Sequence, residues 1–390
     1  MVENNDAVNE SHATRRSILR ATSGAVAGVG LTGIASAESG EKREVNVGFA
    51  NERGRNAAAE AATDVHREFA FDAMTITVPE QAISGLQRNP NVRYVEENGE
   101  MHAFDQTTPW GVERVGAPAA HDADEGGAGA DIAIIDTGVD STHEALQGVL
   151  GEGASFTGCG GLACLLGGNG NDCNRSWDDD NDHGTHCAGT AVAPDDGTGV
   201  VGVATAATLH AVKVLDCLGT GTNSDIAAGI EYTADQGWDV ASMSLGGAQS
   251  DVVSDACTYA HDRGVFVVAA AGNDGECTDC VGYPAAEPNV VAVSATTESD
   301  EIASFSSTGP EIDIAAPGED IYSTVADGYD TFSGTSMACP HVAGAAGHLM
   351  SNGYTNEEAR TRLQETAEDI GLEDTEQGHG LLDVAAAVDV

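Results

Sequence analysis

Short apolar runs alternate with stretches of helical character from residue 130 to the C-terminus. The apolar runs cover residues 131–135, 209–215, 240–244, 264–270 and 290–294. The helical stretches cover residues 184–193, 223–236, 252–263, 335–351 and 356–368. Continuous apolar runs of this length are typical of strands that are buried on both faces. The pattern predicts an α/β fold, with a doubly wound, mostly parallel sheet and helices on both of its faces.

The segment before this region has a different pattern. Apolar and polar residues alternate over 74–78 as in a strand, 81–88 has helical character, and 92–95 is a second short strand. We therefore expect a small α+β domain over residues 38–104, although this segment could also be an unrelated linker.

The charge of the chain is strongly asymmetric. The 390 residues carry 63 acidic and 16 basic side chains, a net charge of −47. Residues 105–390 alone hold 48 acidic and 6 basic side chains, a net charge of −42, and the whole chain has two lysines, Lys42 and Lys213. Such a surface repels itself in dilute buffer, and molar salt shortens the screening length to about 3 Å. We interpret the composition as adaptation to saturating salt rather than ordinary acidity, and it excludes nucleic acid as a partner.

The N-terminus resembles an export signal. Residues 14–20 read TRRSILR and precede a weakly apolar, Gly/Ala-rich stretch over 21–37. This order resembles a twin-arginine signal peptide, here expected over residues 1–37, although a disordered basic leader is the alternative. No other segment approaches 18 apolar residues. We therefore expect a secreted, extracellular protein without a membrane anchor.

Three Gly-rich segments carry the residue types of nucleophilic catalysis. They contain Asp136, His183 and Ser336, in that order along the chain. A serine hydroxyl needs an imidazole to take its proton and a carboxylate to orient that imidazole. Each residue has a simpler interpretation: Ser336 could only cap a helix, His183 could bind a metal with His186, and Asp140 competes for the role of the acid.

The sequence around these residues resembles one protease family. Residues 132–143 read IAIIDTGVDSTH, 183–190 read HGTHCAGT and 333–344 read SGTSMACPHVAG. These segments resemble the subtilisin-like serine proteases (subtilases), and the chain is most similar to the haloarchaeal halolysins among them. The resemblance implies a monomeric endopeptidase that hydrolyses proteins through an acyl-enzyme. It also implies that 38–104 is an intramolecular inhibitor, removed by the enzyme's own cut after Phe104, and that 105–390 is the catalytic domain.

The resemblance extends to the substrate site. It implies that the Asn273 amide donates to the oxyanion and that an extended peptide binds between two glycine-containing segments. These segments and the pocket floor supply Gly219, Gly221, Ser244, Leu245, Gly246 and Gly282. A glycine floor leaves room for a large apolar side chain before the cut bond, and Asp274 at the rim could also admit a basic one.

Nine cysteines occur in the chain. In an exported protein they indicate disulfides, but their pairing is not deducible from the sequence and an odd number leaves at least one unpaired. By resemblance, Cys187 is the expected free thiol. Cys277 and Cys280 are expected to form a disulfide, with a redox CxxC as the alternative.

Two places suggest structural calcium and none suggests an organic cofactor. Asp178 and Asp180 belong to an acidic run of the oxygen-rich type that calcium prefers, although such a run could equally be solvated surface. Gln106 and the loop 194–200 match a calcium site of the family, but Ala145 replaces its carboxylate. The competing functional classes are a non-catalytic binding protein on the same scaffold and an exported redox or metal protein built on the cysteines.

Overall fold

The computed structural model describes residues 42–98, 106–123, 126–160, 164, 168–169, 171–275 and 277–390. These residues divide into two compact units, an N-terminal unit up to residue 98 and a C-terminal unit from residue 106. The signal peptide expected over 1–37 and the cut expected after Phe104 lie outside the described residues. Within the described residues, no helix is long and apolar enough to cross a membrane.

The N-terminal unit is a small α+β fold, as expected. Its antiparallel sheet has the order β2-β3-β1-β4. The elements are β1 (Lys42–Phe49), α1 (Glu52–Ala61), β2 (Asp64–Phe69), β3 (Ala73–Pro79), α2 (Glu80–Arg88) and β4 (Val92–Glu97). Val47, Ile76 and Leu86 belong to its separate apolar core. The sequence pattern missed β1, α1 and β2, and β2 is exposed along most of its length, so it has no apolar face to detect.

The C-terminal unit contains the predicted parallel sheet. Its seven strands have the order β11-β10-β9-β8-β5-β7-β6, and every neighbouring pair is parallel. The strands are β5 (Asp131–Asp136), β6 (Ala154–Ser155), β7 (Thr208–Lys213), β8 (Val240–Met243), β9 (Phe266–Ala270), β10 (Val291–Thr296) and β11 (Ile312–Pro317). The pattern predicted five of these strands. It missed the two-residue β6, and β11, in which Asp313 and Pro317 interrupt the apolar run.

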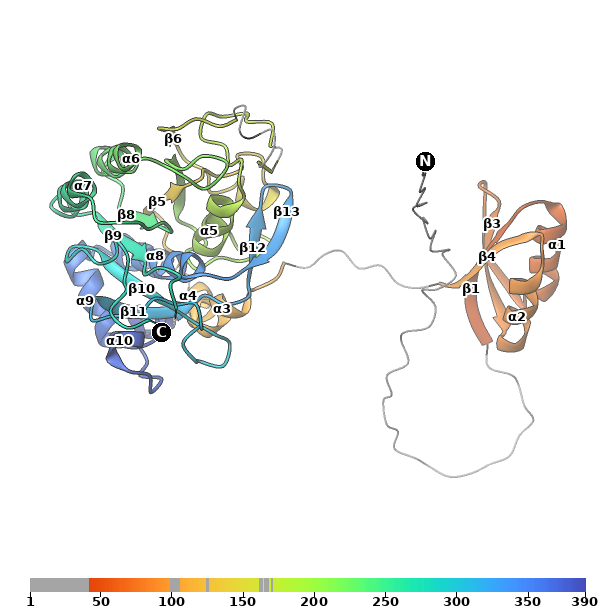
Figure 1. Cartoon of the computed structure of the whole chain (residues 1–390). Helices are drawn as coiled ribbons and strands as arrows, with labels where there is room; N and C mark the ends of the chain where they lie inside the picture. The colour runs from red at the N-terminus through yellow and green to blue at the C-terminus, as the bar shows by residue number, and fades with distance from the viewer. Residues whose placement is uncertain are drawn as a thin grey trace, which may run out of the picture. The chain divides into compact units, whose positions relative to one another are not determined.

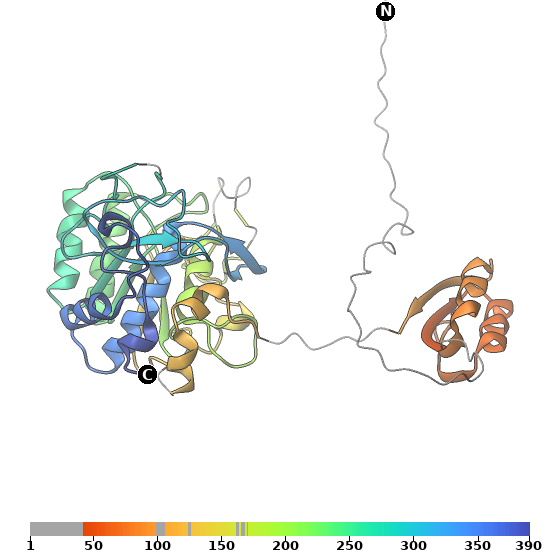
Figure 2. The ribbon, with the colours of Figure 1, turned by 90° about the horizontal axis from the view of Figure 1, so that it is seen from below.

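Helices cover both faces of this sheet, as predicted (Figures 1 and 2). Along β5, Ile132 and Ile134 pack into the core beneath α5 (His183–Val192), α8 (Thr335–Ser351) and α9 (Asn356–Thr366). Ala133 and Ile135 point the other way, into the core beneath α6 (Asn223–Gln236) and α7 (Asp251–His261). Successive residues of β5 thus pack alternately into two apolar layers, one on each face of the sheet.

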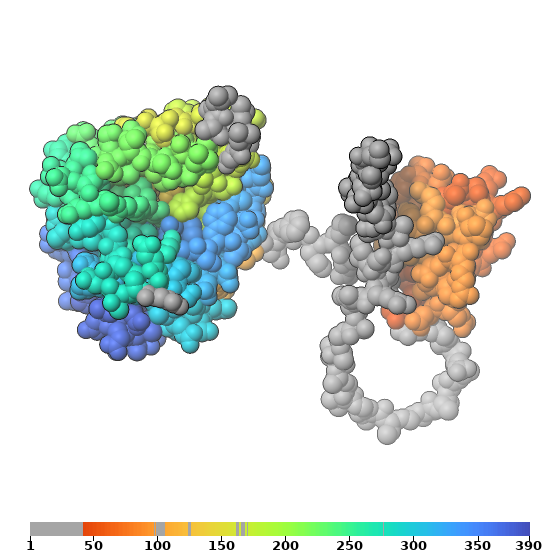
Figure 3. All heavy atoms as spheres, viewed as in Figure 1, coloured from red at the N-terminus to blue at the C-terminus, as the bar shows by residue number. Residues whose placement is uncertain are grey.

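Shorter elements complete the C-terminal unit. They are α3 (Trp110–Arg114), α4 (Ala117–Asp122), η1 (Glu144–Leu146), α10 (Asp374–Gln377), α11 (Val384–Ala387) and the hairpin of β12 (Ile321–Val325) with β13 (Gly328–Phe332). In the space-filling view the green atoms of α6 and α7 form part of the outer surface (Figure 3). Candidate residues follow the carboxyl ends of central strands, since Asp136 ends β5 and Asn273 comes soon after β9.

Candidate active site

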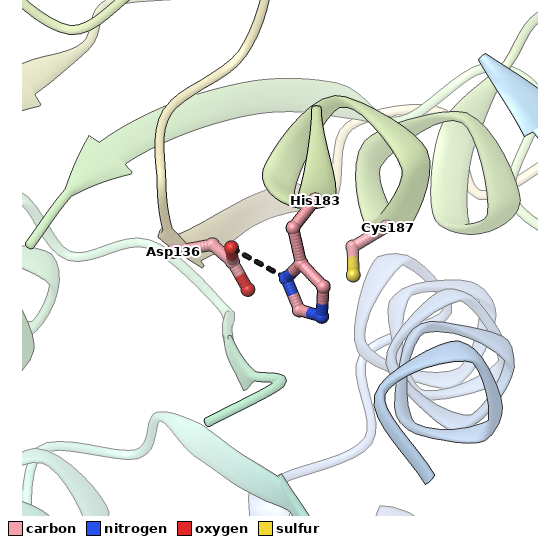
Figure 4. Close-up of side chains that lie close together, drawn as sticks. All are labelled: Asp136, His183 and Cys187. Atoms are coloured by element: carbon pink, nitrogen blue, oxygen red, sulfur yellow. Dashed lines mark hydrogen bonds and ion pairs between the residues drawn. The ribbon is translucent and has the colours of Figure 1, made fainter. Parts of the chain in front are cut away.

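Asp136 and His183 form the centre of the site. The imidazole Nδ1 of His183, the first residue of α5, lies 2.8 Å from Oδ1 of Asp136, and the backbone N–H of Thr137 donates to the same oxygen. The Asp136 side chain is fully buried, whereas that of His183 is 28% exposed. Figure 4 shows the imidazole between this carboxylate and the thiol of Cys187. A hydrogen bond at Nδ1 leaves Nε2 free to act as a base.

The electrostatics of this pair favour a basic imidazole. Burial disfavours the charged form of His183, but attraction to Asp136 and the hydrogen bond outweigh it, so the pKa of His183 lies above 6.5. The alternatives do not have this geometry. Asp140 Oδ1 accepts hydrogen bonds from Thr142, and His186 Nε2 bonds to the Ile321 carbonyl. Burial lowers the pKa of His186 to about 4.

Ser336 is the second residue of α8 and lies next to this pair. Its carbonyl accepts from Ser244 Oγ at 2.8 Å and from Cys187 Sγ at 3.4 Å. The same sulfur lies within 4.8 Å of both the Asp136 carboxylate and a ring nitrogen of His183. The Ser336 hydroxyl itself donates to the Ser244 carbonyl at 3.2 Å. The Ser336 backbone and the His183 ring therefore lie near the same Cys187 sulfur, and the Ser336 hydroxyl is turned to the neighbouring backbone. Hydrogen bonds between catalytic residues often form fully only when substrate binds.

Asn273 presents its amide to the start of α8. Its Oδ1 accepts from the backbone N–H of Thr335 at 2.9 Å and from the Thr335 hydroxyl at 3.1 Å. These two bonds fix the amide so that Nδ2 is the group left free to donate. A Cβ added at Gly334 would lie 3.5 Å from Nδ2 and 3.6 Å from the backbone nitrogen of Ser336. The Asn273 amide nitrogen and the Ser336 backbone nitrogen thus lie close to one point beside Ser336, and an oxyanion site needs two N–H donors placed in this way.

Two cavities share the segment 244–247 as part of their walls. The cavity beside Ser336 has about 290 Å³ and is lined by Ser244, Leu245, Gly246, Gly272, Asn273, Asp274 and Gly282, among others. The other has about 560 Å³ and is lined by Gly219, Gly221 and the same 244–247 segment. A Cβ at Gly282 would meet only the Ala271 carbonyl, at 3.6 Å, so a side chain there would fill space in the smaller cavity. Each predicted substrate residue thus lines at least one of these two cavities, which share the segment 244–247.

The acidic run does not fit a calcium site, and it is not solvated surface either. Asp178, Asp179 and Asp180 are buried. Asp180 Oδ1 pairs with the Lys213 ammonium at 2.6 Å, and its Oδ2 accepts from the Gly160 N–H. Both oxygens of Asp178 accept backbone N–H bonds. Because donors already surround these carboxylates, the expectation of calcium at Asp178 and Asp180 is corrected: they are internal structural acceptors.

Gln106 lies in a different environment. Its Nε2 donates to the carbonyls of Pro194, Thr198 and Val200 at 2.5, 3.2 and 2.9 Å. Three converging carbonyls are the kind of oxygen set that holds calcium. Turning Oε1 of Gln106 to a cation would break the hydrogen bond that this oxygen accepts from the Gly197 N–H at 2.8 Å. Ala145 is buried and supplies no carboxylate. The carbonyls of this loop suit a calcium ion, but the carboxylate of the family site is missing. Calcium at Gln106 therefore stays a prediction.

Six of the nine cysteines form three disulfides: Cys159–Cys173, Cys164–Cys217 and Cys277–Cys280. Cys187 is unpaired, as predicted, but Cys257 and Cys339 are unpaired and buried as well. Sequence reasoning missed these two because nothing local distinguishes a buried thiol from half of a disulfide.

A buried Asp–His pair, a serine at the start of a helix and two neighbouring N–H groups beside it are the parts of a serine hydrolase that acts by acyl transfer. The chain belongs to the subtilase family, since residues 127–380 match the profile described as "Subtilase family". It is 39% identical over 371 residues to subtilisin E of Bacillus subtilis (strain 168), covering 92% of this chain and 93% of that protein. This chain is therefore a subtilisin-like serine endopeptidase.

Two further relatives support the assignment. An alkaline protease of Shouchella clausii is 38% identical over 327 residues, covering 83% of this chain and 81% of that protein. A thermostable alkaline protease of Halalkalibacterium halodurans is 36% identical over 359 residues, covering 90% and 94%. These relatives are bacterial, and similarity of this chain to the haloarchaeal halolysins stays a prediction.

Proposed function

We propose that this chain is the precursor of an exported, salt-requiring endopeptidase of the halolysin type that removes its own N-terminal segment. The observation that carries the chemistry is the 2.8 Å contact between His183 Nδ1 and the buried Asp136 carboxylate. That contact fixes the ring with Nε2 unprotonated, which is the form a general base needs.

The proposed catalytic roles rest on the His183–Asp136 contact and on the subtilase segments around these residues. In this mechanism the Ser336 side chain turns from the Ser244 carbonyl toward His183 Nε2, which takes the hydroxyl proton as Oγ bonds to the substrate carbonyl carbon. Asn273 Nδ2 and the Ser336 N–H donate to the resulting oxyanion. The His183 imidazolium then protonates the leaving amine as the C–N bond breaks. Water, activated by the same imidazole, releases the acyl group and restores Ser336.

The substrate is a protein or peptide in extended form. It lies between the segments 219–221 and 244–246, with the side chain before the cut bond in the 290 Å³ cavity. Glycines in both walls allow close backbone approach. Phe, Leu and Tyr fit this cavity, and Phe104, the residue before the proposed maturation cut, has the same character.

The maturation proposal rests on the division of the chain. Residues 38–104 act as an intramolecular inhibitor, and the cut after Phe104 leaves 105–390 as a monomeric enzyme. Support comes from the independent core of the N-terminal unit and from the resemblance of the segment ending at Phe104 to a prodomain tail. The twin-arginine signal over 1–37 would export the precursor. Calcium, bound by Gln106 and the carbonyls around it, would stabilise the loop 194–200.

Intact mass of the wild type and of Ser336→Ala, both purified from high salt, tests this proposal. We expect the wild type to begin near residue 105 and the variant to retain residues 38–104. Ser351→Ala, on the same helix but outside both cavities, is the matched control and should mature normally. If Ser336→Ala has the same N-terminus as the wild type, an external protease makes the cut and self-maturation is wrong.

A further inference from the structure

The larger of the two cavities contains one unusual group. It has about 560 Å³, and Glu287 is the one carboxylate among the described residues that line it. Much of the remaining lining is apolar or glycine, including Leu215, Ile226, Leu245 and Val253. A carboxylate beside aliphatic walls is costly unless a partner meets it, so this residue calls for an explanation.

Hydrogen bonds hold both the side chain and the backbone of Glu287 in the wall of the larger cavity. Its Oε1 accepts a short hydrogen bond from the hydroxyl of Ser254 on α7. Its backbone N–H donates to the Pro284 carbonyl at 3.0 Å, which anchors the residue at its main chain as well. Glu287 is half-buried, so its carboxylate is neither free in solvent nor fully enclosed.

No basic side chain of the C-terminal unit reaches this carboxylate among the described residues. Lys213 pairs with Asp180, and Arg114 pairs with Asp300 and Glu368. Other basic groups are engaged elsewhere: Arg360 with Asp313, Arg362 with Asp389, and Arg263 over the ring of Tyr259. Arg175 is exposed and does not line the cavity. Any positive charge that pairs with Glu287 would therefore have to come from a bound molecule, and the half-buried carboxylate is accessible to one.

We propose that this cavity is a substrate subsite for a lysine or arginine that precedes the cut bond, with Glu287 as its specificity-determining residue. The proposal rests on endopeptidase activity at Ser336 and on the proposed peptide groove. The cavity shares the 244–247 segment with the pocket beside Ser336, so one extended peptide can fill both. The aliphatic stem of Lys or Arg would pack on the apolar walls while its charged head meets the carboxylate.

High salt makes this subsite selective. In dilute buffer, 42 net negative charges attract any cationic peptide. At molar salt the screening length falls to about 3 Å, so only a contact ion pair in a partly desolvated site still discriminates. Glu287, pinned and half-buried, meets this condition, whereas an exposed acidic side chain does not.

The test is a set of peptides with Phe before the cut bond. Arg, Leu or Glu is placed in turn at the second to fifth residue before that bond, and kcat/KM is measured in molar salt. We expect one position at which Arg exceeds Leu and Glu by about tenfold. Glu287→Gln should remove this preference without slowing the Leu peptide, and Glu287→Lys should favour Glu instead. Glu298→Gln removes an equal charge from an exposed site and should change nothing.

Each contrary result overturns the proposal. It fails if no position favours Arg, if Glu287→Gln keeps the preference, if Glu287→Lys does not invert it, or if Glu298→Gln also loses it. The Leu peptide reports folding and chemistry in every variant. A wild type that cleaves no peptide would instead refute the proposed function, so the two failures are distinguishable.

Discussion

His183 Nδ1 lies 2.8 Å from Oδ1 of Asp136, while Oδ2 of that buried carboxylate accepts no hydrogen bond from the described residues. The carboxylate thus depends on the imidazole and on one backbone N–H, from Thr137, for its stabilisation. An uncompensated buried charge favours a proton on the ring beside it. This explains why the pKa of His183 is raised although burial opposes the charged imidazole.

Asp136→Asn should therefore change both rate and pH dependence. The amide can hold the ring in the wrong tautomer, and we expect kcat to fall about 10⁴-fold, the order of loss that serine proteases show for this change. Activity needs the neutral ring, so kcat/KM rises with pH through the raised pKa of His183. Without the carboxylate that pKa falls, and the acid limb of the residual activity should move to lower pH. Profiles of kcat/KM against pH in high salt measure both effects, and an unmoved limb would contradict the assignment.

Asn273→Leu should reduce kcat with little change in KM. Its Nδ2 is positioned to meet charge that exists only in the transition state, so substrate binding does not depend on it. We expect a loss of about 10²–10³ in kcat. Asn289→Leu, which removes an amide from outside both cavities, is the matched control. A rise in KM with unchanged kcat would place Asn273 in substrate binding instead.

The pair Lys213–Asp180 should be a major contributor to stability. The ammonium is fully buried, and it also donates to the carbonyl of Thr137, next to Asp136, at 2.5 Å. Lys213→Met leaves the Asp180 charge without its partner, and we expect the free energy of unfolding to fall by about 3–5 kcal/mol. Denaturant unfolding at molar salt, in a Ser336→Ala background that prevents autolysis, measures this loss.

A double variant separates the charge from the packing. Adding Asp180→Asn to Lys213→Met removes the unpaired charge and should recover much of the lost stability. Arg175→Met, at an exposed site, should have little effect. If the double variant is no more stable than Lys213→Met alone, the ion pair is not the source of the loss.

Sequence reasoning predicted the parts of this fold that depend on local pattern. Ile132, Ile134 and their neighbours form a continuous apolar run, because a strand between two helical layers has no solvent face. The segments of Asp136, His183 and Ser336 were identifiable for a similar reason, since each carries its chemistry within a few residues. Strand β2 was missed because it is exposed, and β11 because Asp313 interrupts it.

The sequence did not indicate which side chains pair when they lie far apart along the chain. Asp180 looked like a cation ligand or a solvated side chain because Lys213, 33 residues away, gives no local sign of its position. Glu287 likewise meets Ser254 from 33 residues away, across the wall of a cavity. Such pairs depend on the assembled core, and only the folded chain shows which charges remain without a partner.

The disulfide Cys164–Cys217 should stabilise the enzyme more than Cys159–Cys173. The two bonds join residues 53 and 14 positions apart. Closing the longer loop restricts the unfolded chain more, and loop entropy gives about 4 kcal/mol against about 3 kcal/mol. Paired Cys→Ser variants, unfolded in denaturant at molar salt, should show this order. If the Cys159–Cys173 bond contributes more stability than Cys164–Cys217, loop entropy does not set the order. Cys217 also lies beside the segment 219–221 that lines the larger cavity, so we expect its removal to raise KM.

Salt dependence should follow from screening rather than from water activity. The C-terminal region carries 48 acidic and 6 basic side chains, and most of the basic ones are already paired within the fold. Below about 0.5 M salt, repulsion among the remaining carboxylates should unfold the protein. Circular dichroism of Ser336→Ala during dilution measures this, with NaCl and KCl expected to protect equally at equal ionic strength. Sucrose at the same water activity does not screen charge and should not protect. A protein that stays folded in dilute buffer would contradict halophilic adaptation. Protection by sucrose alone would show that exclusion of solute from the protein surface, and not charge screening, maintains the fold.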